Sequence, residues 1–337
     1  MYDDALMARA RELSEFTAIP RLAALFRSPS ARVTVGIGDD AAVLTLAQKS
    51  GLVWTVDTAV EHVHFERAWL TLADVGWRSF HAAASDVSAM GGAPLGALSS
   101  VIFPPRFAAS ELEQVARGQR AAARALGCSV VGGNLSRGAE LSVTTSVLGH
   151  APRPLLRSGA RVGDELWLCG DVGLAAAGLR LLQRGTRQGK SPAERRALTA
   201  FRRPRAQLKA GLALSGRARA AIDISDGLAG DAAHLAKASH VRLVVELDAL
   251  EAALTPALRR LGPALGLSAL ELALYGGEDY ALLATGPGRA RPAGARVIGR
   301  VERGQGVWLT LSKAGRLIRA GAGFEHLGGR SPRRMGR

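Results

Sequence analysis

Residues 36–42, GIGDDAA, place two adjacent carboxylates, Asp39 and Asp40, beside a glycine turn. Acidic residues are the minority in this chain of 337 residues, which has 44 Lys and Arg against 29 Asp and Glu. Further acidic residues stand beside glycine or near the ends of expected strands, in the segments TVDT (Asp57), AASDVSAMGG (Asp86), DISDGL (Asp223, Asp226) and YGGEDY (Glu278, Asp279). Because carboxylates gathered in a cleft repel one another, these segments indicate bound cations between them.

The donor types favour Mg²⁺ and phosphate chemistry. Hard oxygen ligands without histidine or thiolate suit Mg²⁺, which usually completes its coordination with phosphate oxygens. The glycine segments 91–96 (GGAPLG) and 130–134 (VVGGN) offer backbone N–H groups to phosphates, although short glycine pairs are weak signals alone. We therefore expect metal-assisted phosphoryl transfer.

Each candidate residue also has a purely structural interpretation. Asp86 lies in a helical pattern and fits a surface or capping position, and Glu278 fits a solvated turn. Asp223 and Asp226 share one face if their segment is helical, but Asp226 also fits the N-cap of a helix starting at 227. The same capping alternative applies to Ser225, and solvated or structural roles suit His64 and Arg157.

The formal net charge of +15 is compatible with a nucleic-acid partner or with an anionic small substrate. The arginines are spread along the chain, and the densest runs are FRRPR at 201–205 and RSPRRMGR at 330–337. Aromatic residues make up only 5% and do not interleave with these runs, as a stacking platform for single strands requires. We expect no nucleic-acid partner.

The chain is expected to be soluble and cytoplasmic. Cys128 and Cys169 lie in apolar runs that indicate buried strands with reduced thiols, and no zinc-ligand spacing is present. The segment MYDDALMARARELSEF lacks the apolar core of a signal peptide, and no apolar run approaches about 20 residues. We expect no membrane partner.

Alternation and helical spacing predict two α/β halves. The first half has two short helices within residues 1–27, a strand ending at Asp57, helices at 71–90 and 109–127, and strands at 92–104, 128–134 and 141–150. The second has helices near 173–183, 192–200, 206–218, 227–239, 254–260 and 268–274, and strands near 165–169, 219–224, 241–247, 279–285, 295–301 and 307–311. The expected domains are 1–150 for ATP, Mg²⁺ and dimerisation and 151–327 for a C-terminal α/β domain, followed by a disordered tail at 328–337.

In order and spacing, a set of segments closely resembles the signature blocks of the thiamine-monophosphate kinase family. These segments are GIGDDAAVL, TVDTAVEHVHF, SDVSAMGGAPLGAL, VVGGN, RSGARVGDELWLCGDVG, DISDGLAGD and YGGEDYALL. The resemblance covers about residues 15–326, and the family is a branch of the ATP-binding superfamily that includes aminoimidazole ribonucleotide synthetase.

The resemblance implies ATP-dependent phosphorylation of thiamine monophosphate to thiamine diphosphate, with several Mg²⁺ ions and no side chain acting as a catalytic base. It implies an α/β (α+β) fold of two domains, in which the N-terminal sheet pairs with that of a second subunit in a homodimer. By position, the implied metal ligands are Asp39, Asp40, Thr55, Val56 (through its backbone oxygen), Asp57, Asp86, Asn134, Asp223 and Asp226. The implied ATP contacts are Gly133, Asn134, Arg157 and Ser225, and the substrate contacts are His64, Glu278 and Phe324.

Two positions depart from the family pattern. Asn134 stands where the family usually has the aspartate of GGD, which leaves the number of Mg²⁺ ions open. Ala281 replaces a second glutamate after GGEDY. The alternatives are another superfamily enzyme such as aminoimidazole ribonucleotide synthetase, a nonenzymatic nucleic-acid-binding protein, and a silent homologue that binds nucleotide without turnover.

Overall fold

The computed structural model describes residues 21–22, 24–26, 33–35, 43–44, 51–311 and 317–320. Residues 21–22 and 24–26 are helical, in agreement with the expected N-terminal helices, and β1 (Val33–Val35) pairs antiparallel with β2 (Val43–Leu44) on either side of residues 36–42. Three predicted site residues, Asp39, Asp40 and Phe324, lie outside the described residues, as does the segment 328–337.

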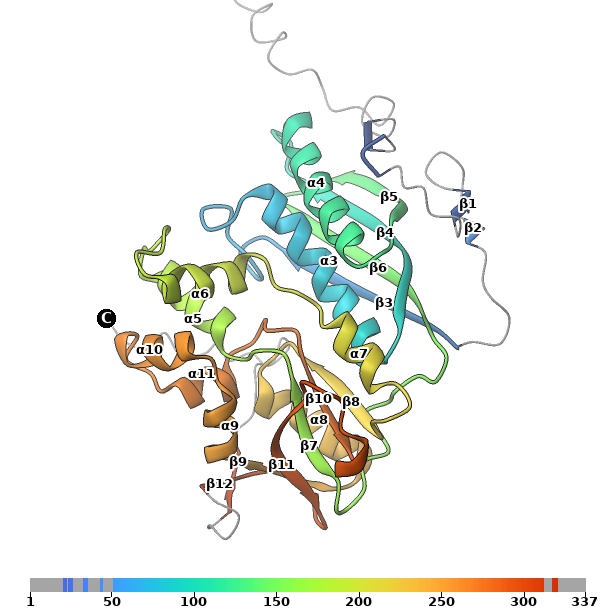
Figure 1. Ribbon diagram of the computed structural model, residues 1–337. Helices are drawn as coiled ribbons and strands as arrows, with labels where there is room; N and C mark the ends of the chain where they lie inside the picture. Colours follow the sequence, from blue (N-terminus) through green and yellow to red (C-terminus); the bar gives the residue numbers. More distant parts are fainter. Residues whose placement is uncertain are drawn as a thin grey trace, which may run out of the picture.

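The first half contains a four-stranded sheet in the order β3-β6-β4-β5 (Figure 1). Its strands are β3 (Gly51–Val60), β4 (Ala93–Phe103), β5 (Val130–Arg137) and β6 (Ser142–Ala151). Helices α3 (Leu72–Ala89) and α4 (Ala109–Ala125) cover one face of it (Figure 1). Along β6, buried residues alternate with half-buried ones, as expected for a sheet with helices on one side only.

Helix α3 is the central element of this half. A capping box between Thr71 and Asp74 fixes its start. It packs closely on α4 through glycine residues. A Cβ on Gly76 would lie 2.0 Å from the Val115 carbonyl oxygen, and a Cβ on Gly118 would lie 2.0 Å from the Ala73 carbonyl oxygen. The helix backbones therefore touch, which fixes α3 and α4 relative to each other.

The second half contains a seven-stranded sheet in the order β13-β12-β9-β11-β7-β10-β8. Its strands are β7 (Glu165–Cys169), β8 (Ala220–Ile224), β9 (Arg242–Glu246), β10 (Ala281–Gly286), β11 (Arg296–Glu302), β12 (Gly306–Thr310) and β13 (Ile318–Arg319). Its helices are α5 (Leu174–Gln183), α6 (Pro192–Arg202), α7 (Leu208–Leu214), α8 (Leu228–Ser239), α9 (Leu247–Ala253), α10 (Pro256–Ala264) and α11 (Ala269–Tyr275). The expected mixed α/β fold is confirmed.

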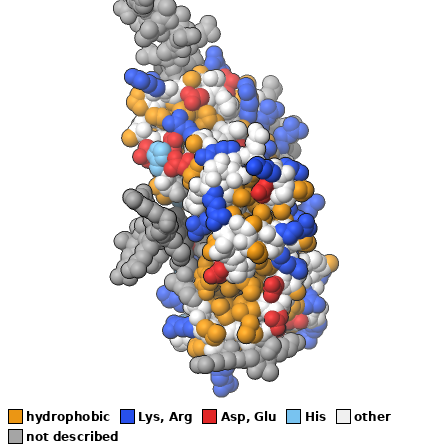
Figure 2. All heavy atoms as spheres, turned by 90° about the vertical axis from the view of Figure 1, so that its left-hand side faces the viewer, with side chains coloured by type: hydrophobic (Ala, Val, Ile, Leu, Met, Phe, Trp, Pro, Cys, Tyr) orange, Lys and Arg blue, Asp and Glu red, His pale blue; other side chains and the backbone are white. Residues whose placement is uncertain are grey.

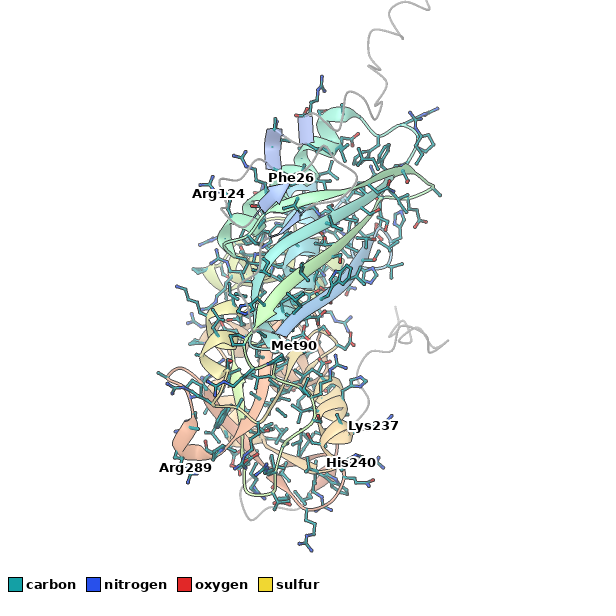
Figure 3. All side chains as sticks on the ribbon, turned by 90° about the vertical axis from the view of Figure 1, so that its right-hand side faces the viewer. Phe26, Met90, Arg124, Lys237, His240 and Arg289 are labelled. Atoms are coloured by element: carbon teal, nitrogen blue, oxygen red, sulfur yellow. The ribbon has the colours of Figure 1, made fainter. Side chains whose placement is uncertain are left out.

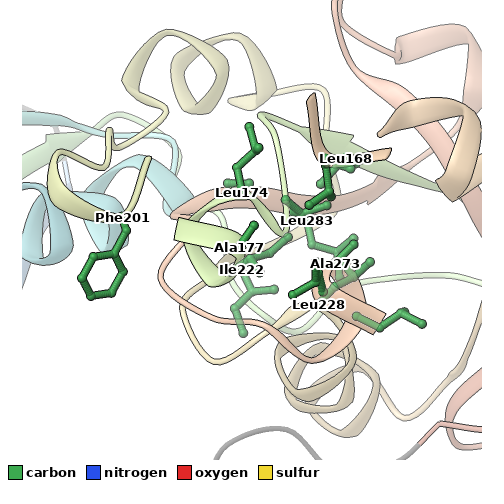
Figure 4. Close-up of a cluster of buried hydrophobic side chains, with 14 of the residues drawn as sticks. Leu168, Leu174, Ala177, Phe201, Ile222, Leu228, Ala273 and Leu283 are labelled. Atoms are coloured by element: carbon green, nitrogen blue, oxygen red, sulfur yellow. The ribbon is translucent and has the colours of Figure 1, made fainter. Parts of the chain in front are cut away.

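The two halves share a hydrophobic core. One cluster of buried side chains runs from Val75 and Phe103 in the first half to Leu168, Ile222 and Leu283 in the second. Figure 4 shows its C-terminal part, where residues from strands β7, β8 and β10 meet those of the surrounding helices. This shared core fixes the strand ends of one half against helix α3 of the other.

The chain crosses between the halves beside the end of α3. Met90 lies where the four-stranded sheet meets the C-terminal half (Figure 3), and its carbonyl oxygen accepts a hydrogen bond of 3.0 Å from the Leu155 backbone N–H. In α7, a Cβ on Gly211 would lie 2.0 Å from the Ser88 carbonyl oxygen. The C-terminal end of α3 is therefore enclosed by elements of both halves.

Several predicted boundaries were wrong. Strand β3 continues past Asp57 to Val60, because its register with β6 is unbroken over that length. Strand β10 begins at 281 rather than 279, since Tyr280 has a φ of 50°. The helix expected at 206–218 is confined to 208–214, and α9 at 247–253 and β13 were missed. Both cysteines are buried and free, as expected.

The basic run 201–205 packs against helix α3. The Arg203 guanidinium lies 4.9 Å from the centre of the Trp77 ring and forms an ion pair of 3.0 Å with Asp74. The Trp77 indole N–H donates to the Pro204 carbonyl oxygen at 2.7 Å. Elsewhere Lys and Arg side chains are distributed over the face shown in Figure 2. This run therefore has a packing role.

No helix within the described part of the chain is both long enough and apolar enough to cross a membrane.

Candidate active site

Strand β3 and helix α3 together position three of the predicted metal-binding side chains. Thr55 and Asp57 alternate with exposed residues along β3, so both point toward the helix-covered face of the sheet. The Thr55 hydroxyl donates a hydrogen bond of 2.5 Å to Oδ2 of Asp86 on α3. Asp86 is thus not a surface residue of the helix but is directed at the strand.

Burial and crowding perturb these carboxyl groups. Burial raises the pKa of Asp86, while the Thr55 hydroxyl and Arg157 lower it. Burial also raises the pKa of Asp57, although its Oδ1 accepts a 2.6 Å hydrogen bond from the Thr58 N–H. Glu278 and Asp86 raise the pKa of Asp57 further and His64 lowers it, so these groups are close enough to interact.

Asp223 adds a deeply buried carboxyl group from the other half of the chain. It lies near the end of β8, which excludes the helical arrangement with Asp226, and it is only 6% exposed. Burial raises its pKa to about 8, and the charge of Asp86 contributes to this rise. A hydrogen bond with Ser85 and the charge of Arg157 lower the pKa in part. The electrostatic contact with Asp86 joins β8 of the second half to α3 of the first.

The turn after β8 is organised by a residue that the sequence analysis did not single out. Asp231, in α8, accepts hydrogen bonds through Oδ2 from the backbone N–H groups of Ser225 at 3.1 Å and Asp226 at 3.0 Å. Burial and the charge of Asp226 raise its pKa to about 7. The N-cap of α8 is Gly227, with a φ of 106°, so the capping interpretation of Asp226 and Ser225 was wrong.

The GGEDY segment packs directly on that turn. The Glu278 N–H donates to the Ser225 carbonyl oxygen at 2.7 Å, and the Tyr280 N–H donates to that of Ile224 at 2.8 Å. A Cβ on Gly277 would lie 2.4 Å from the Ser225 carbonyl oxygen, so glycine is needed for this approach. Glu278 has a φ of 68° and is held in place, which excludes a freely solvated turn.

The carboxylates of this segment have different partners. Glu278 forms an ion pair with the buried Arg78 of α3 and accepts a hydrogen bond of 2.8 Å from the Tyr280 hydroxyl. Asp279 accepts hydrogen bonds from the N–H groups of Gly173 at 2.6 Å and Ala175 at 3.2 Å, at the start of α5. Burial raises the pKa of Asp279 to about 7 despite these bonds.

Sequence reasoning missed Arg78, Asp231 and Tyr280 as members of the site. The one available signal was the third aspartate of DISDGLAGD, at position 231. Nothing in the pattern of α3 distinguished Arg78, and Tyr280 gave no sign of its hydroxyl partner.

The remaining predicted contacts lie at the edge of this cluster. His64 is half-buried after β3, and its Nδ1 accepts a hydrogen bond of 3.1 Å from the Val60 N–H. Arg157 is exposed and lowers the pKa values of three carboxyl groups, those of Asp86, Asp223 and Asp231. It is therefore a cation facing the carboxylates.

Two predicted positions lie on the opposite face of the four-stranded sheet. Asn134 donates to the Ser136 hydroxyl at 3.0 Å, on the face without helices, and Val56 is 63% exposed on that face. Strands β3 and β5 are the two edges of the sheet, so Asn134 is about 14 Å from Asp57 within one chain. Gly133 lies against β4, where a Cβ would be 1.7 Å from the Ser99 carbonyl oxygen. One chain does not bring Asn134 and Gly133 to the carboxylates, whereas Val56 lies between Thr55 and Asp57, and the ligand predicted there is its backbone oxygen.

The donor set suits a hard cation that shares its coordination with a ligand. The groups that meet are carboxylate and hydroxyl oxygens, which Mg²⁺ prefers. Within the described ranges, no three His, Cys, Asp or Glu side chains are placed to hold a metal by themselves. Phosphate oxygens and water would therefore supply part of the coordination.

Comparisons with known proteins identify the family of the chain. The family models described as AIR synthase related protein, N-terminal domain and C-terminal domain match residues 38–151 and 161–311. The thiamine-monophosphate kinase of Aquifex aeolicus (strain VF5) is 36% identical over 307 residues, or 90% of this chain and 97% of that protein.

Two solved structures are similar over nearly the whole chain. The thiamine-monophosphate kinase from Stenotrophomonas maltophilia K279a has a TM-score of 0.78 at 32% identity, covering 88% of this chain and 96% of that one. AaThiL complexed with AMPPCP and TMP has a TM-score of 0.76 at 31% identity, covering 94% and 98%. The chain belongs to the thiamine-monophosphate kinase family of AIR synthase related proteins.

Proposed function

We propose that the protein transfers the γ-phosphoryl group of ATP to thiamine monophosphate, releasing thiamine diphosphate and ADP. The observation that carries this proposal is the convergence of Asp57, Asp86, Asp223 and Glu278 from separate segments on one place, with Arg157 facing them. The similarity to a thiamine-monophosphate kinase from Aquifex aeolicus and to AaThiL complexed with AMPPCP and TMP supports the choice of substrates.

Magnesium is the proposed metal, and Thr55, Asp57, Asp86, Asp223 and Asp226 would hold it, with Asp39 and Asp40 expected to contribute. Bound Mg²⁺ would neutralise charge on the phosphates of ATP. Burial raises the pKa values of Asp57, Asp86 and Asp223, and the charge of Asp86 raises those of Asp57 and Asp223 further, so a cation between these groups would relieve both effects.

The protein's own side chains bind and orient the two substrates. Arg157 and Ser225, beside Asp223 and Asp226, are proposed to contact ATP, and His64 and Glu278, beside Asp57, are proposed to contact thiamine monophosphate. A phosphate monoester is largely ionised near neutral pH, so its oxygen attacks without a strong base. Positioning and charge neutralisation are then the main contributions to the rate.

A homodimer formed through the helix-free face of the four-stranded sheet is part of the proposal. This face exposes a set of large apolar side chains: Leu52 (51%), Trp54 (74%), Val56 (63%), Leu98 (42%) and Ile102 (38%). Exposed apolar area of this kind is typical of an interface. Asn134 and Gly133 lie in the same sheet and would reach ATP from there.

Two finer expectations stay proposals as well. The first is the division into domains 1–150 and 151–327 with a tail at 328–337. The second is a cytoplasmic location.

Light scattering of the wild-type protein and of Trp54→Arg tests the dimer. A charge on the helix-free face of the four-stranded sheet should produce a monomer.

An ADP-release assay with thiamine monophosphate, ATP and Mg²⁺ tests the activity. Free thiamine is the control substrate, and Asp57→Asn is the control variant because it removes a proposed metal ligand while keeping the shape of the side chain. We expect thiamine diphosphate only from the monophosphate and none from the variant. Folded protein that binds ATP but yields no thiamine diphosphate would refute the proposal.

A further inference from the structure

Arg78 is a buried cation that crosses from the first half of the chain to the second. It lies in the first half of α3, is 2% exposed, and forms an ion pair with Glu278. Its Nη1 donates to the carbonyl oxygen of Phe201 in α6, and its guanidinium lies 4.4 Å from the centre of the Phe201 ring. A charge buried to this extent requires partners, and both of them come from the C-terminal half.

The contact fixes one oxygen of the Glu278 carboxylate. Oε2 is the atom paired with Arg78, and it also accepts the 2.8 Å hydrogen bond from the Tyr280 hydroxyl. The Glu278 backbone is held at a φ of 68° by its hydrogen bond to Ser225. With the backbone and Oε2 both fixed, Oε1 is left for another donor, and the side chain is still 27% exposed.

Helix α3 relates this carboxylate to the proposed metal-binding groups. Arg78 and Asp86 are eight residues apart on one helix, which corresponds to about 12 Å along its axis. Asp57 interacts electrostatically with both Glu278 and Asp86, so both carboxylates are within electrostatic reach of it. A rigid helix that holds Glu278 at one point and carries Asp86 at another sets the separation of the two.

We propose that Arg78 is a positioning residue, which orients Glu278 toward thiamine monophosphate and ties it to the helix that carries Asp86. The inference rests on the proposed function. Arginine suits this position because its planar guanidinium stacks on the Phe201 ring, donates to the Phe201 carbonyl oxygen through one nitrogen and presents the other to the Glu278 carboxylate, which a lysine ammonium cannot do together.

A double-mutant cycle on the full-length protein tests whether Arg78 acts through Glu278. Arg78→Lys keeps the charge but removes the stacking and the second guanidinium nitrogen that pairs with Glu278. We expect it to raise KM for thiamine monophosphate about tenfold, with KM for ATP within about twofold of the wild-type value. In a Glu278→Gln background, the same change should alter KM for thiamine monophosphate by less than about twofold.

Two further variants separate positioning from packing. Arg203→Lys is the matched control, because Arg203 also links the 201–205 segment to α3, through Trp77 and Asp74, without touching Glu278. It should leave both KM values unchanged. Tyr280→Phe removes only the hydrogen bond to Oε2, leaves the ion pair with Arg78, and should raise KM for thiamine monophosphate in the same direction as Arg78→Lys.

The outcomes distinguish this inference from the proposed function. An equal rise in KM in both backgrounds, an equal rise in KM for ATP, or a loss of thermal stability with unchanged KM values would overturn the role of Arg78 alone. Absence of thiamine diphosphate from the wild-type protein would overturn the proposed function together with the inference. If Arg78→Lys does not fold, an unchanged KM in Tyr280→Phe decides against the inference.

Discussion

Replacing Asp223 with Asn is expected to stabilise the metal-free protein while abolishing turnover. Asp223 is 6% exposed and has Asp86 and Asp231 as charged neighbours. Its ionised form is therefore unfavourable in the folded chain. Asparagine has nearly the same shape and no charge, so it removes that cost together with the proposed metal ligand.

The size of the effect follows from the pKa of Asp223, which rises from 3.8 to about 8 on folding. At pH 7 the unfolded carboxyl group is ionised, 3.2 pH units above its pKa of 3.8, whereas the folded group is mostly protonated. At about 1.4 kcal/mol per unit this costs up to about 4 kcal/mol of unfolding free energy. Relaxation around the buried group reduces it, and we expect about 2 kcal/mol. For a chain of 337 residues that corresponds to a rise in Tm of about 3 °C.

The pH dependence has a defined sign. Since the folded state keeps a proton that the unfolded state releases, the contribution of Asp223 to wild-type stability falls as pH rises from about 4 to about 8. Asp223→Asn lacks this contribution, so its advantage in Tm should be small near pH 4, increase up to about pH 8, and then level off. Calorimetry in a chelating buffer at several pH values between these limits measures it.

The control is Asp164, a buried aspartate that has an arginine partner. Asp164 is 1% exposed and pairs with Arg219 at 2.5 Å, so Asp164→Asn should lower Tm across the same pH range. A lower Tm for Asp223→Asn at every pH, or a difference that does not grow with pH, would refute the reasoning. Addition of ATP and Mg²⁺ should raise the Tm of the wild-type protein and not that of the variant.

Three other changes test neighbouring contacts. Asp279→Asn should make thermal stability fall less steeply between about pH 4 and pH 7. The folded pKa of Asp279 is about 7, so its carboxyl group destabilises the folded protein increasingly as pH rises through this range. An unchanged slope contradicts this. Gly277→Ala should lower the free energy of unfolding in urea by about 2 kcal/mol, since the new Cβ would lie 2.4 Å from the Ser225 carbonyl oxygen, and a neutral result would show that the turns can separate. Thr55→Val removes a hydrogen bond that lowers the pKa of Asp86, so the acid limb of the kcat/KM profile should move to higher pH rather than stay in place.

Local patterns were sufficient for most of the fold and for the segments that carry the site. Helix α3 was predicted within two residues because its spacing and its Thr71 start are local properties. The strands of the first sheet followed from their alternation in the same way. The electrostatic grouping of Asp57, Asp86 and Asp223 agrees with the expectation that acidic residues near glycines and strand ends gather in one place.

The features of the site that could not be predicted from the sequence depend on contacts between distant segments. The close approach of the turns at Ser225 and Gly277 joins residues about 50 apart and is decided by tertiary packing. Arg78 and Glu278 are 200 residues apart, so no periodicity relates them. The face on which Asn134 lies depends on the register of β5 with β4, which sequence spacing does not specify.

The protein contains two kinds of buried aspartate, and the contrast between them bears on function. Asp164 has an arginine partner at 2.5 Å, an arrangement that offsets the cost of burying a charge. Asp223 and Asp231 are also buried, but the charges that act on them include other carboxylates, and the cation that faces both, Arg157, is exposed. Selection for stability alone would favour the first arrangement. The second is reasonable where a soluble cation arrives with its substrate, because the energy stored in the crowded carboxylates then becomes affinity for the metal-bound phosphate.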